Sequence, residues 1–243
     1  MIKKSIFKTA VLCLIAGQKM NVKNIILVAA VLAGMTACGN NGLPKNDILG
    51  NIPSLIYQKA QTDSILYAKG EAKGKGVDKK DLAKIEKIFT EYAKEKEEAD
   101  EKFKKELDAE VEKYRGKDIP FSVISELGYE VTSVKFGKLS KLNNVSEDRK
   151  VEFYFKIKIT DVSKLNVSHP FERGQKAQVL TPIVFINSTG KILQYSNYQS
   201  VYFDKIDIQN GDECSQTGSF YLNADNAADF ADFKKMVFIM KLD

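Results

Sequence analysis

Residue types that commonly perform catalysis are scarce in this 243-residue chain. It contains one histidine, His169, so a metal site built from several histidines is impossible, and a Ser-His-Asp or Cys-His mechanism would have to use this residue. Proline follows it at position 170 and restricts His169 to extended geometry, as in a turn-like loop. No Gly-x-Ser-x-Gly nucleophile motif occurs in the chain. We therefore interpret His169 as a surface loop residue and predict a protein that is not an enzyme and has no catalytic residues.

The three cysteines are Cys13, Cys38 and Cys214. The first two lie in or next to apolar N-terminal stretches that resemble targeting signals, so Cys214 has no partner for a disulfide bond. A disulfide framework is thereby excluded. We expect Cys214 to be a half-buried structural thiol.

Two groups of acidic residues have the chemistry of calcium ligands. They are Asp204, Asp207, Asp212 and Glu213, and then Asp225, Asp229 and Asp232. Neither group has the Asp-x-Asn-x-Asp-Gly spacing that places several oxygens around one ion. A phosphate-binding glycine loop and a dinucleotide-binding fingerprint are also absent from the sequence. The sequence therefore predicts no metal and no cofactor.

The segment that begins at Met20 has the layout of a secretory signal. The basic residue Lys23 precedes an apolar run from Ile25 to Met35, and small residues end the run directly before Cys38. The run is shorter than the roughly 20 apolar residues that a helix needs to span a bilayer. This arrangement resembles the lipobox of bacterial lipoproteins. The resemblance implies that residues 1–37 are a signal peptide and that Cys38 becomes the acylated first residue of the mature chain.

Residues 1–17 form a second, weaker signal-like stretch, so either translation starts at Met20 or two signals stand in tandem. In both cases the lipid on Cys38 is expected to anchor the protein to a membrane. In many bacterial lipoproteins an aspartate after the cysteine retains the protein at the inner membrane, whereas this chain has Gly39 there. The resemblance therefore favours the outer membrane. It leaves open whether the protein faces the periplasm or the cell surface.

The net charge depends on whether the N-terminal segment is removed. The whole chain has 37 basic and 32 acidic residues, but residues 1–37 contain five lysines and no acidic residue. The mature chain is thus neutral, which argues against binding of nucleic acid through bulk charge. Its apolar content, 44% of the whole chain, is enough for a packed core.

A charged helical segment is expected over residues 52–116, after a lipid-anchored tether over residues 38–51. The first helix is predicted over residues 52–68 and ends before the glycines of residues 70–76. The second is predicted over residues 79–114, with Asp78 as its N-cap and Gly116 as its stop. Its residues 93–102 are almost wholly polar and are expected to project into solvent.

Two arrangements of these helices remain open. The apolar stripe of the second helix either packs on the first helix in an intramolecular hairpin or serves as a stalk or coiled-coil arm for a partner. The second arrangement would produce a homodimer through residues 79–115. We favour the hairpin, because the first helix also has an apolar face to bury.

From residue 117 the spacing of apolar residues changes from a helical period to an alternation. Residues 151–159 alternate most clearly, with apolar side chains on one face and charged ones on the other. Further strands are predicted at 119–123, 129–136, 179–186, 192–195, 198–208, 218–222 and 237–242. Turns are predicted at residues 187–190 and at the Asn-Gly pair 210–211, and a short helix at 225–235.

The spacing of these strands indicates an antiparallel β-sandwich over residues 117–243. The pattern of residues 129–242, with its central strand, its hairpin at 189–191 and its Asn-Gly-Asp turn, resembles the immunoglobulin-like domains often found on bacterial envelope lipoproteins. The Cys-Trp-Cys core of antibody domains is missing, since the chain has no tryptophan. The expected fold class is α+β, with an N-terminal helical hairpin or long helix followed by an immunoglobulin-like sandwich.

Two kinds of surface site are candidates. Exposed aromatic residues of the C-terminal half, namely Tyr195, Tyr198 and Tyr202, have the chemistry to contact a glycan or a partner protein. In addition, Asp63-Ser64-Ile65 resembles the three-residue acceptor for O-glycans on exported proteins of the Bacteroides group, which would place a glycan on Ser64. Its expected position within a helix counts against this site.

The sequence therefore predicts an envelope lipoprotein that acts as a binding, adaptor or structural module. Its partners would be a membrane, through the lipid anchor, and an unidentified envelope protein or glycan. The alternatives are a hydrolase with an unrecognised carboxylate site and a self-associating coiled-coil spacer.

Overall fold

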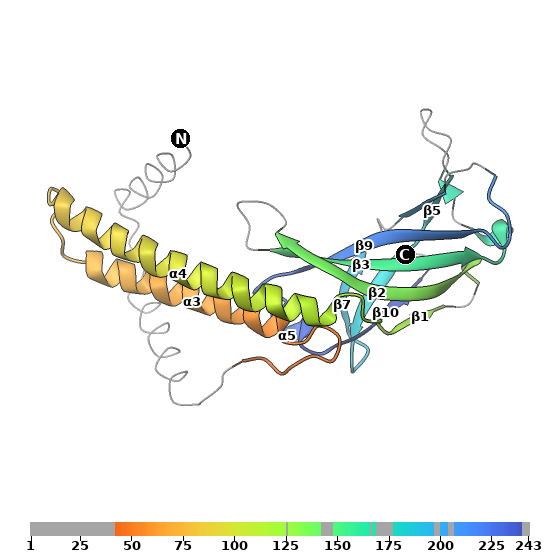
Figure 1. Cartoon of the computed structure of the whole chain (residues 1–243), viewed down its shortest axis with the longest axis horizontal. Coiled ribbons are helices and arrows are strands. Elements are labelled where there is room, and N and C mark those ends of the chain that lie inside the picture. The colour runs from red at the N-terminus through yellow and green to blue at the C-terminus, as the bar shows by residue number, and fades with distance from the viewer. Residues whose placement is uncertain are drawn as a thin grey trace. The chain divides into compact units, whose positions relative to one another are not determined.

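The computed structural model describes residues 42–124, 126–141, 148–165, 167–168, 177–196, 200–203 and 207–239. Two helices come first, and strands follow in sheets whose neighbouring strands are mostly antiparallel (Figure 1). The α+β class expected from the sequence is confirmed. Within these ranges no helix is both long enough and apolar enough to cross a membrane.

Helix α3 spans Ile52–Gly74 and has Pro53 in its first turn, where a missing backbone N–H leaves no helical hydrogen bond unmade. The sequence predicts an end at residue 68, and this prediction is wrong because the helix continues through Gly70. A Cβ atom at Gly70 would lie 3.5 Å from the ring of Tyr92 on the neighbouring helix. Packing against that helix thus outweighs the low helix propensity of glycine.

Helix α4 spans Leu82–Tyr114, and its N-cap is Asp81, whose side chain accepts a hydrogen bond from the backbone N–H of Lys84. The predicted cap, Asp78, instead accepts from the N–H of Lys80 in the preceding turn, so the helix begins three residues later than expected. Its end is as predicted, because Gly116 has a φ of 74°, which a side chain would disfavour.

The two helices form an antiparallel hairpin, the arrangement favoured from the sequence (Figure 1). The ion pairs that join them include Lys59–Asp100 at 2.7 Å, Lys96–Asp63 at 3.1 Å, Lys69–Glu95 at 2.7 Å and Lys73–Glu91 at 2.7 Å. The expectation that residues 93–102 project into solvent holds for the exposed side of the helix but not for the side that faces α3. Lys96 and Asp100 belong to this polar interval, and they pair with residues of α3.

Two larger sheets and one small sheet make up the β region. The first has the order β2-β3-β9, with β2 at Tyr129–Lys141, β3 at Arg149–Ile159 and β9 at Glu213–Leu222. The second has the order β1-β10-β6-β7, with β1 at Phe121–Val123, β10 at Phe233–Phe238, β6 at Ile183–Asn187 and β7 at Ile192–Ser196. The small sheet has the order β4-β5-β8, with β4 at Val167–Ser168, β5 at Ala177–Leu180 and β8 at Ser200–Phe203. Two short helices complete the elements, η1 at Val162–Lys164 and α5 at Ala227–Phe230.

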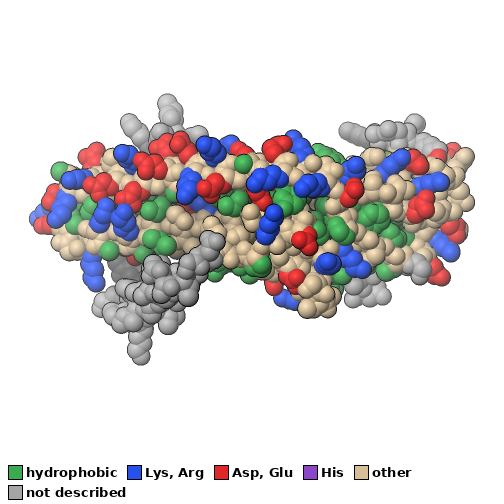
Figure 2. All heavy atoms as spheres, turned by 60° about the horizontal axis from the view of Figure 1, so that its bottom comes forward, with side chains coloured by type: hydrophobic (Ala, Val, Ile, Leu, Met, Phe, Trp, Pro, Cys, Tyr) green, Lys and Arg blue, Asp and Glu red, His purple; other side chains and the backbone are tan. Residues whose placement is uncertain are grey.

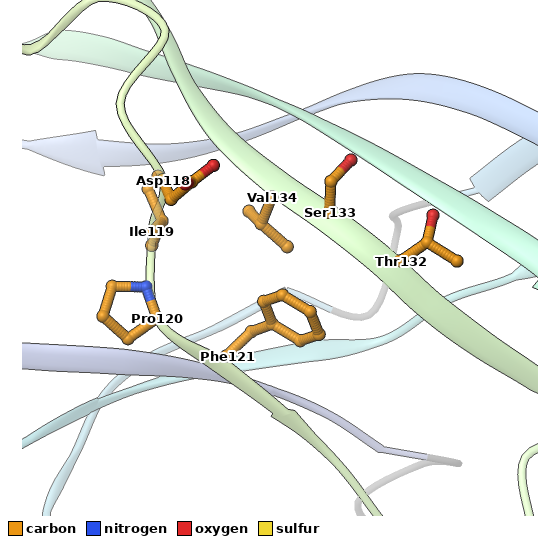
Figure 3. Close-up of a pocket in the computed structure, with 7 residues that line it drawn as sticks. All are labelled: Asp118, Ile119, Pro120, Phe121, Thr132, Ser133 and Val134. Atoms are coloured by element: carbon orange, nitrogen blue, oxygen red, sulfur yellow. The ribbon is translucent and has the colours of Figure 1, made fainter.

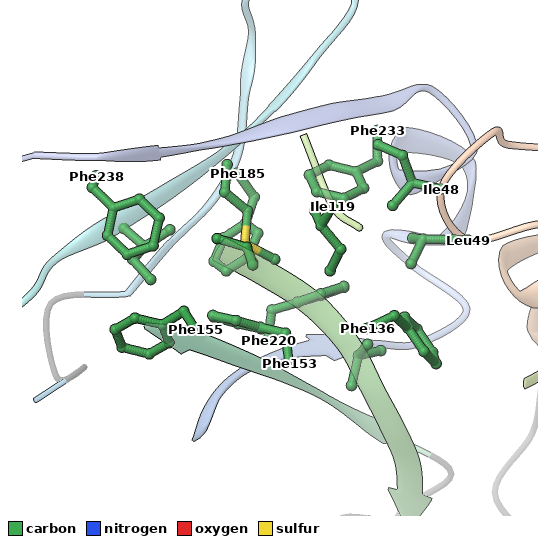
Figure 4. Close-up of a cluster of buried hydrophobic side chains, with 14 of the residues drawn as sticks. Ile48, Leu49, Ile119, Phe136, Phe153, Phe155, Phe185, Phe220, Phe233 and Phe238 are labelled. Carbon is green, nitrogen blue, oxygen red and sulfur yellow. The ribbon is translucent and has the colours of Figure 1, made fainter. Parts of the chain in front are cut away.

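The two larger sheets pack face to face through phenylalanine rings (Figure 4). Rings of the first sheet contact rings of the second, with centroid distances of 5.5 Å for Phe155–Phe238, 4.8 Å for Phe220–Phe185 and 6.0 Å for Phe153–Phe185. These side chains are almost completely buried. Burial of large aromatic surfaces between the sheets is the main apolar contribution to the stability of the β region.

A tether was predicted from the sequence over residues 38–51. In the structure residues 46–51 instead belong to this core. Leu49 and Ile52 are fully buried, and they lie in the same apolar cluster as the phenylalanines. The buried side chain of Asn46 donates hydrogen bonds to the carbonyl oxygens of Ala231, at 3.1 Å, and Phe233, at 2.8 Å. The segment before α3 is therefore fastened to the start of β10.

Several strand boundaries differ from the predicted ones. The strand predicted at 179–186 is divided between β5 and β6, which belong to different sheets, because Pro182 cannot donate a ladder hydrogen bond. The helix predicted at 225–235 is only the four residues of α5, and β10 begins inside the predicted range. Part of the strand predicted at 198–208 and the last residues of that predicted at 237–242 lie outside the described residues.

Candidate functional site

A pocket lies at the seam where the two larger sheets separate, between the segment before β1 and the edge of β2. Residues 117–119 pair with β2, since the N–H of Ile119 donates to the carbonyl of Val134 at 2.8 Å. The chain then leaves β2 at Pro120, whose carbonyl accepts from the N–H of Met236 in β10 at 2.9 Å. This change of partner opens a space of about 410 Å³ between the strands.

The lining of this seam pocket combines apolar and hydrogen-bonding groups. Asp118, Ile119, Pro120 and Phe121 lie on one side and Thr132, Ser133 and Val134 on the other, with the ring of Phe121 directed into the space between them (Figure 3). The polar side chains of this lining are one carboxylate and two hydroxyls. This is an open depression at the surface, and its lining offers neither a histidine nor a second acid for proton transfer.

The outer face of the first sheet combines charged side chains with two exposed tyrosines, Tyr154 and Tyr221, which are 48% and 40% exposed. Charged side chains on this face pair within β3, Glu152 with Lys150 at 3.1 Å, and across strands, Glu152 with Lys138 at 3.5 Å and Lys156 with Glu213. A hydrated, charged face of this kind is ordinary for an antiparallel sheet with one side in solvent. It needs no binding partner.

The outer face of the second sheet is largely apolar. The register aligns Tyr195, Val184, Val237 and Ser122 in one row across its strands, and Ile192, Ile186 and Lys235 in another. Val184 is buried at the centre of the first row, whereas Ile192 is 49% exposed. Hydrophobic side chains also gather over the β region in the view of Figure 2. Ile186, Val237 and Tyr195 are partly exposed, so this face presents a row of partly exposed apolar side chains with Ile192 at its edge.

The tyrosines predicted as partner contacts do not form one surface. Tyr195 belongs to the apolar outer face just described, where it is half-buried. Tyr202 lies on β8 in the small sheet, is 47% exposed, and accepts a hydrogen bond from the side chain of Gln178 at 3.2 Å. Tyr198 lies outside the described residues. Of the predicted tyrosines, therefore, Tyr195 belongs to the apolar face. Its aliphatic neighbours were not predicted from the sequence, because they become neighbours only through the order of the strands.

Two other predicted residues have ordinary structural surroundings. Ser64 lies within α3, where its hydroxyl donates to the carbonyl of Ala60 at 2.9 Å, and the adjacent Asp63 pairs with Lys59 and Lys96. Cys214 is half-buried on β9 and its thiol donates to the carbonyl of Tyr202 at 3.2 Å. Cys13, Cys38 and His169 lie outside the described residues.

The acidic residues do not converge. Asp212 accepts a hydrogen bond from the N–H of Gln209, Glu213 pairs with Lys156, and Asp229 pairs with Lys191. In the parts of the chain that are described, no three His, Cys, Asp or Glu side chains are placed to hold one metal ion. Asp204 lies outside these parts.

Comparison of the chain with protein-family models, with curated proteins and with solved structures finds no match. The geometry of the seam pocket and of the apolar face is therefore the basis for the assignment of a function.

Proposed function

We propose that the protein is a non-enzymatic binding module of the bacterial cell envelope, anchored at the outer membrane through a lipid on Cys38. It would engage a partner protein through the apolar outer face of the sheet β1-β10-β6-β7. The observation that carries this proposal is the row of aliphatic side chains on the outer face of this sheet. The packing of the two larger sheets also supports the likeness to immunoglobulin-like envelope domains, as an architecture only.

The composition of the apolar face favours a protein partner over a glycan. Its rows consist mainly of Val184, Val237, Ile186 and Ile192, with one tyrosine at the edge. Aliphatic side chains supply apolar area but no hydrogen bonds, whereas sugar rings need both stacking and polar contacts. A protein surface with complementary apolar side chains satisfies such a face.

The start of the folded region sets the distance to the proposed anchor. Asn46 is the first buried residue of the described chain, and it lies eight positions after Cys38. An extended chain of this length reaches roughly 28 Å. The folded region would therefore begin within this distance of the membrane. The lipid on Cys38 would restrict binding to partners located near the membrane.

Site-specific photocrosslinking in cells tests the binding face. A photoreactive amino acid at Ile192 is expected to give a discrete adduct with another envelope protein, and the additional substitution Val237→Lys is expected to abolish it. The matched control places the same photoreactive residue at Val162, an exposed aliphatic position on η1. The proposal is wrong if Ile192 gives no adduct beyond that of Val162, or if Val237→Lys leaves the adduct unchanged in a protein that still folds.

The anchor has its own test, because the lipid and the binding face are separate claims. Metabolic labelling with an alkyne fatty acid is expected to label the wild-type chain and not the Cys38→Ala variant. Equal labelling of both would overturn the anchor while leaving the binding face in place.

The arrangement of α4 favours this proposal over self-association through residues 79–115. Leu107, Val111 and Tyr114 from its apolar stripe are buried within the same chain. Phe103 packs against the same core. The outward face of the helix consists mostly of charged residues, which offer little apolar area to a second copy.

A further inference from the structure

The edge of β2 is paired over only part of its length. On one side β2 pairs with β3 from Tyr129 to Lys141. On the other side, within the described ranges, only residues 116–119 pair with it: the N–H groups of Gly116 and Ile119 donate to the carbonyls of Phe136 and Val134, and the N–H of Phe136 donates to the carbonyl of Lys117. Between Tyr129 and Ser133 no described strand covers this edge. The edge is thus a template for one more strand.

The position of Pro120 explains why the pairing stops. Proline has no backbone N–H, so it cannot continue the ladder that Ile119 begins. The next residues, Phe121–Val123, instead form a parallel pair with β10. The seam pocket lies where the pairing between this segment and β2 is missing. Beside it the register of β2 on β3 shifts between Val131 and Ser133, and the hydroxyl of Thr132 donates to the carbonyl of Lys156 on β3 at 3.3 Å.

We propose that this edge binds an extended peptide segment of another protein by β-strand addition. The segment would continue the line of residues 117–119 antiparallel to β2, form backbone hydrogen bonds along Val131–Ser133, and place one apolar side chain in the seam pocket against Phe121 and Val134. The chain's own residues 117–119 already occupy the first half of this track, so the added strand extends an existing ladder. This site is separate from the apolar face of the proposed function and goes beyond it.

The charge at the mouth of the pocket gives the peptide a preference. Asp118 is exposed there and lines the pocket beside the polar side chains of Thr132 and Ser133. A lysine or arginine next to the apolar residue of the peptide would meet this carboxylate. Main-chain hydrogen bonds would then supply affinity, while the pocket and Asp118 select the side chains.

Selection from a phage library of random dodecapeptides, displayed against the full chain purified in detergent, tests this proposal. The expected result is a set of peptides with alternating apolar residues and an adjacent basic residue. Their binding is expected to slow amide hydrogen exchange at Val131–Ser133. Absence of any enriched peptide, or protection elsewhere only, would overturn the proposal.

Two variants make the test specific. Thr132→Trp is expected to weaken the selected peptides at least tenfold, whereas Thr217→Trp, at an exposed position on the opposite edge strand of the same sheet, is expected to leave binding unchanged. Asp118→Lys is expected to shift the selected sequences from basic to acidic residues, and it tests the site even if Thr132→Trp fails to fold. Equal binding to the Thr132→Trp and Thr217→Trp proteins, or no change of charge preference with Asp118→Lys, contradicts the proposal. Ile192→Lys is expected to have no effect on these peptides, so this proposal and the proposed function can fail separately.

Discussion

The backbone N–H of Asn51 donates a hydrogen bond of 2.8 Å to Oε1 of Glu110, which joins the residue before α3 to the C-terminal part of α4. Glu110 also pairs with Lys113 at 2.8 Å and is itself buried. The chain therefore enters and leaves the helical hairpin at the same place. The hairpin thus adds no distance between residues 46–51 and the sheets.

Acid is expected to weaken this junction. Burial alone would raise the pKa of Glu110, but the hydrogen bonds from Lys113 and Asn51 outweigh it and hold the pKa below its ordinary value. A carboxyl group with a lowered pKa stabilises the fold above its unfolded pKa, about 4.3 for glutamate, and this contribution is lost as the pH falls through the lower, folded value.

Urea unfolding measured from pH 6 to pH 3 checks this expectation. The wild-type free energy of unfolding is expected to fall below about pH 4.5, and Glu110→Gln is expected to flatten that fall. Glu106→Gln, at a largely exposed position on the same helix, serves as the control. Identical pH profiles for Glu110→Gln and the wild type would exclude Glu110 as a source of the acid sensitivity.

Lys59 is expected to be the most important lysine of the hairpin. Its side chain is 6% exposed, pairs with Asp63 and Asp100, and lies 6.0 Å from the centre of the Phe103 ring. Lys59→Ala removes the cation from two carboxylates and is expected to cost roughly 1–3 kcal/mol. Lys94→Ala, which breaks a highly exposed pair with Glu98, is expected to have little effect on stability. Equal effects of the two substitutions in chemical denaturation would refute this ranking.

Asn46→Ala is expected to loosen the N-terminal segment. The side-chain NH2 of Asn46 donates to the carbonyls of Ala231 and Phe233, and its Oδ1 accepts from the N–H groups of Ile48 and Leu49 at 2.8 Å each. Loss of these buried partners is expected to cost roughly 2–4 kcal/mol in urea unfolding. Asn51→Ala is the control, since the exposed Asn51 side chain caps no backbone group. A destabilisation by Asn46→Ala no larger than that by Asn51→Ala would contradict the assignment.

Two glycines are expected to respond oppositely to alanine. Gly50 has a φ of 60°, and a Cβ atom there would collide with the Tyr114 ring and the Glu110 carboxylate. Gly50→Ala is therefore expected to cost more than about 2 kcal/mol. Gly74, in the last turn of α3, has open space around it, so Gly74→Ala is expected to be neutral or to stabilise by up to about 1 kcal/mol. Thermal unfolding of both variants measures the difference, and a melting temperature lowered equally in both would be inconsistent with this geometry.

Local patterns in the sequence predicted the features that depend on neighbouring residues. The alternation of residues 151–159 corresponds to β3, at the centre of its sheet. The turn glycines Gly190 and Gly211 have φ values of 86° and 94°, which explains why glycine occupies these positions. In each case the signal arises within a few residues.

Features that depend on distant residues were not predictable in this way. Residues 93–102 have no apolar stripe that would predict packing. Their contact with α3 is made instead by ion pairs, Lys96 with Asp63 and Asp100 with Lys59, and it depends on residues more than 30 positions away. The apolar outer face needs the strand order β1-β10-β6-β7, which places Val237 beside Val184 although 53 positions separate them in the sequence. The seam pocket likewise arises from the change of partner at Pro120. The sequence showed this proline but could not show which strands lie on either side of it.

The position of β10 constrains when the molecule can fold. This strand is formed from nearly the last described residues, yet it lies in the interior of its sheet between β1 and β6, and it also receives the side chain of Asn46, 187 positions earlier. The second sheet therefore cannot form completely until the C-terminal part of the chain, which contains β10, has been synthesised. Until then Leu49, Ile52 and the inward phenylalanines lack their cover, so a chain interrupted before residue 233 is expected to be a substrate for chaperones and proteases and not a smaller folded domain.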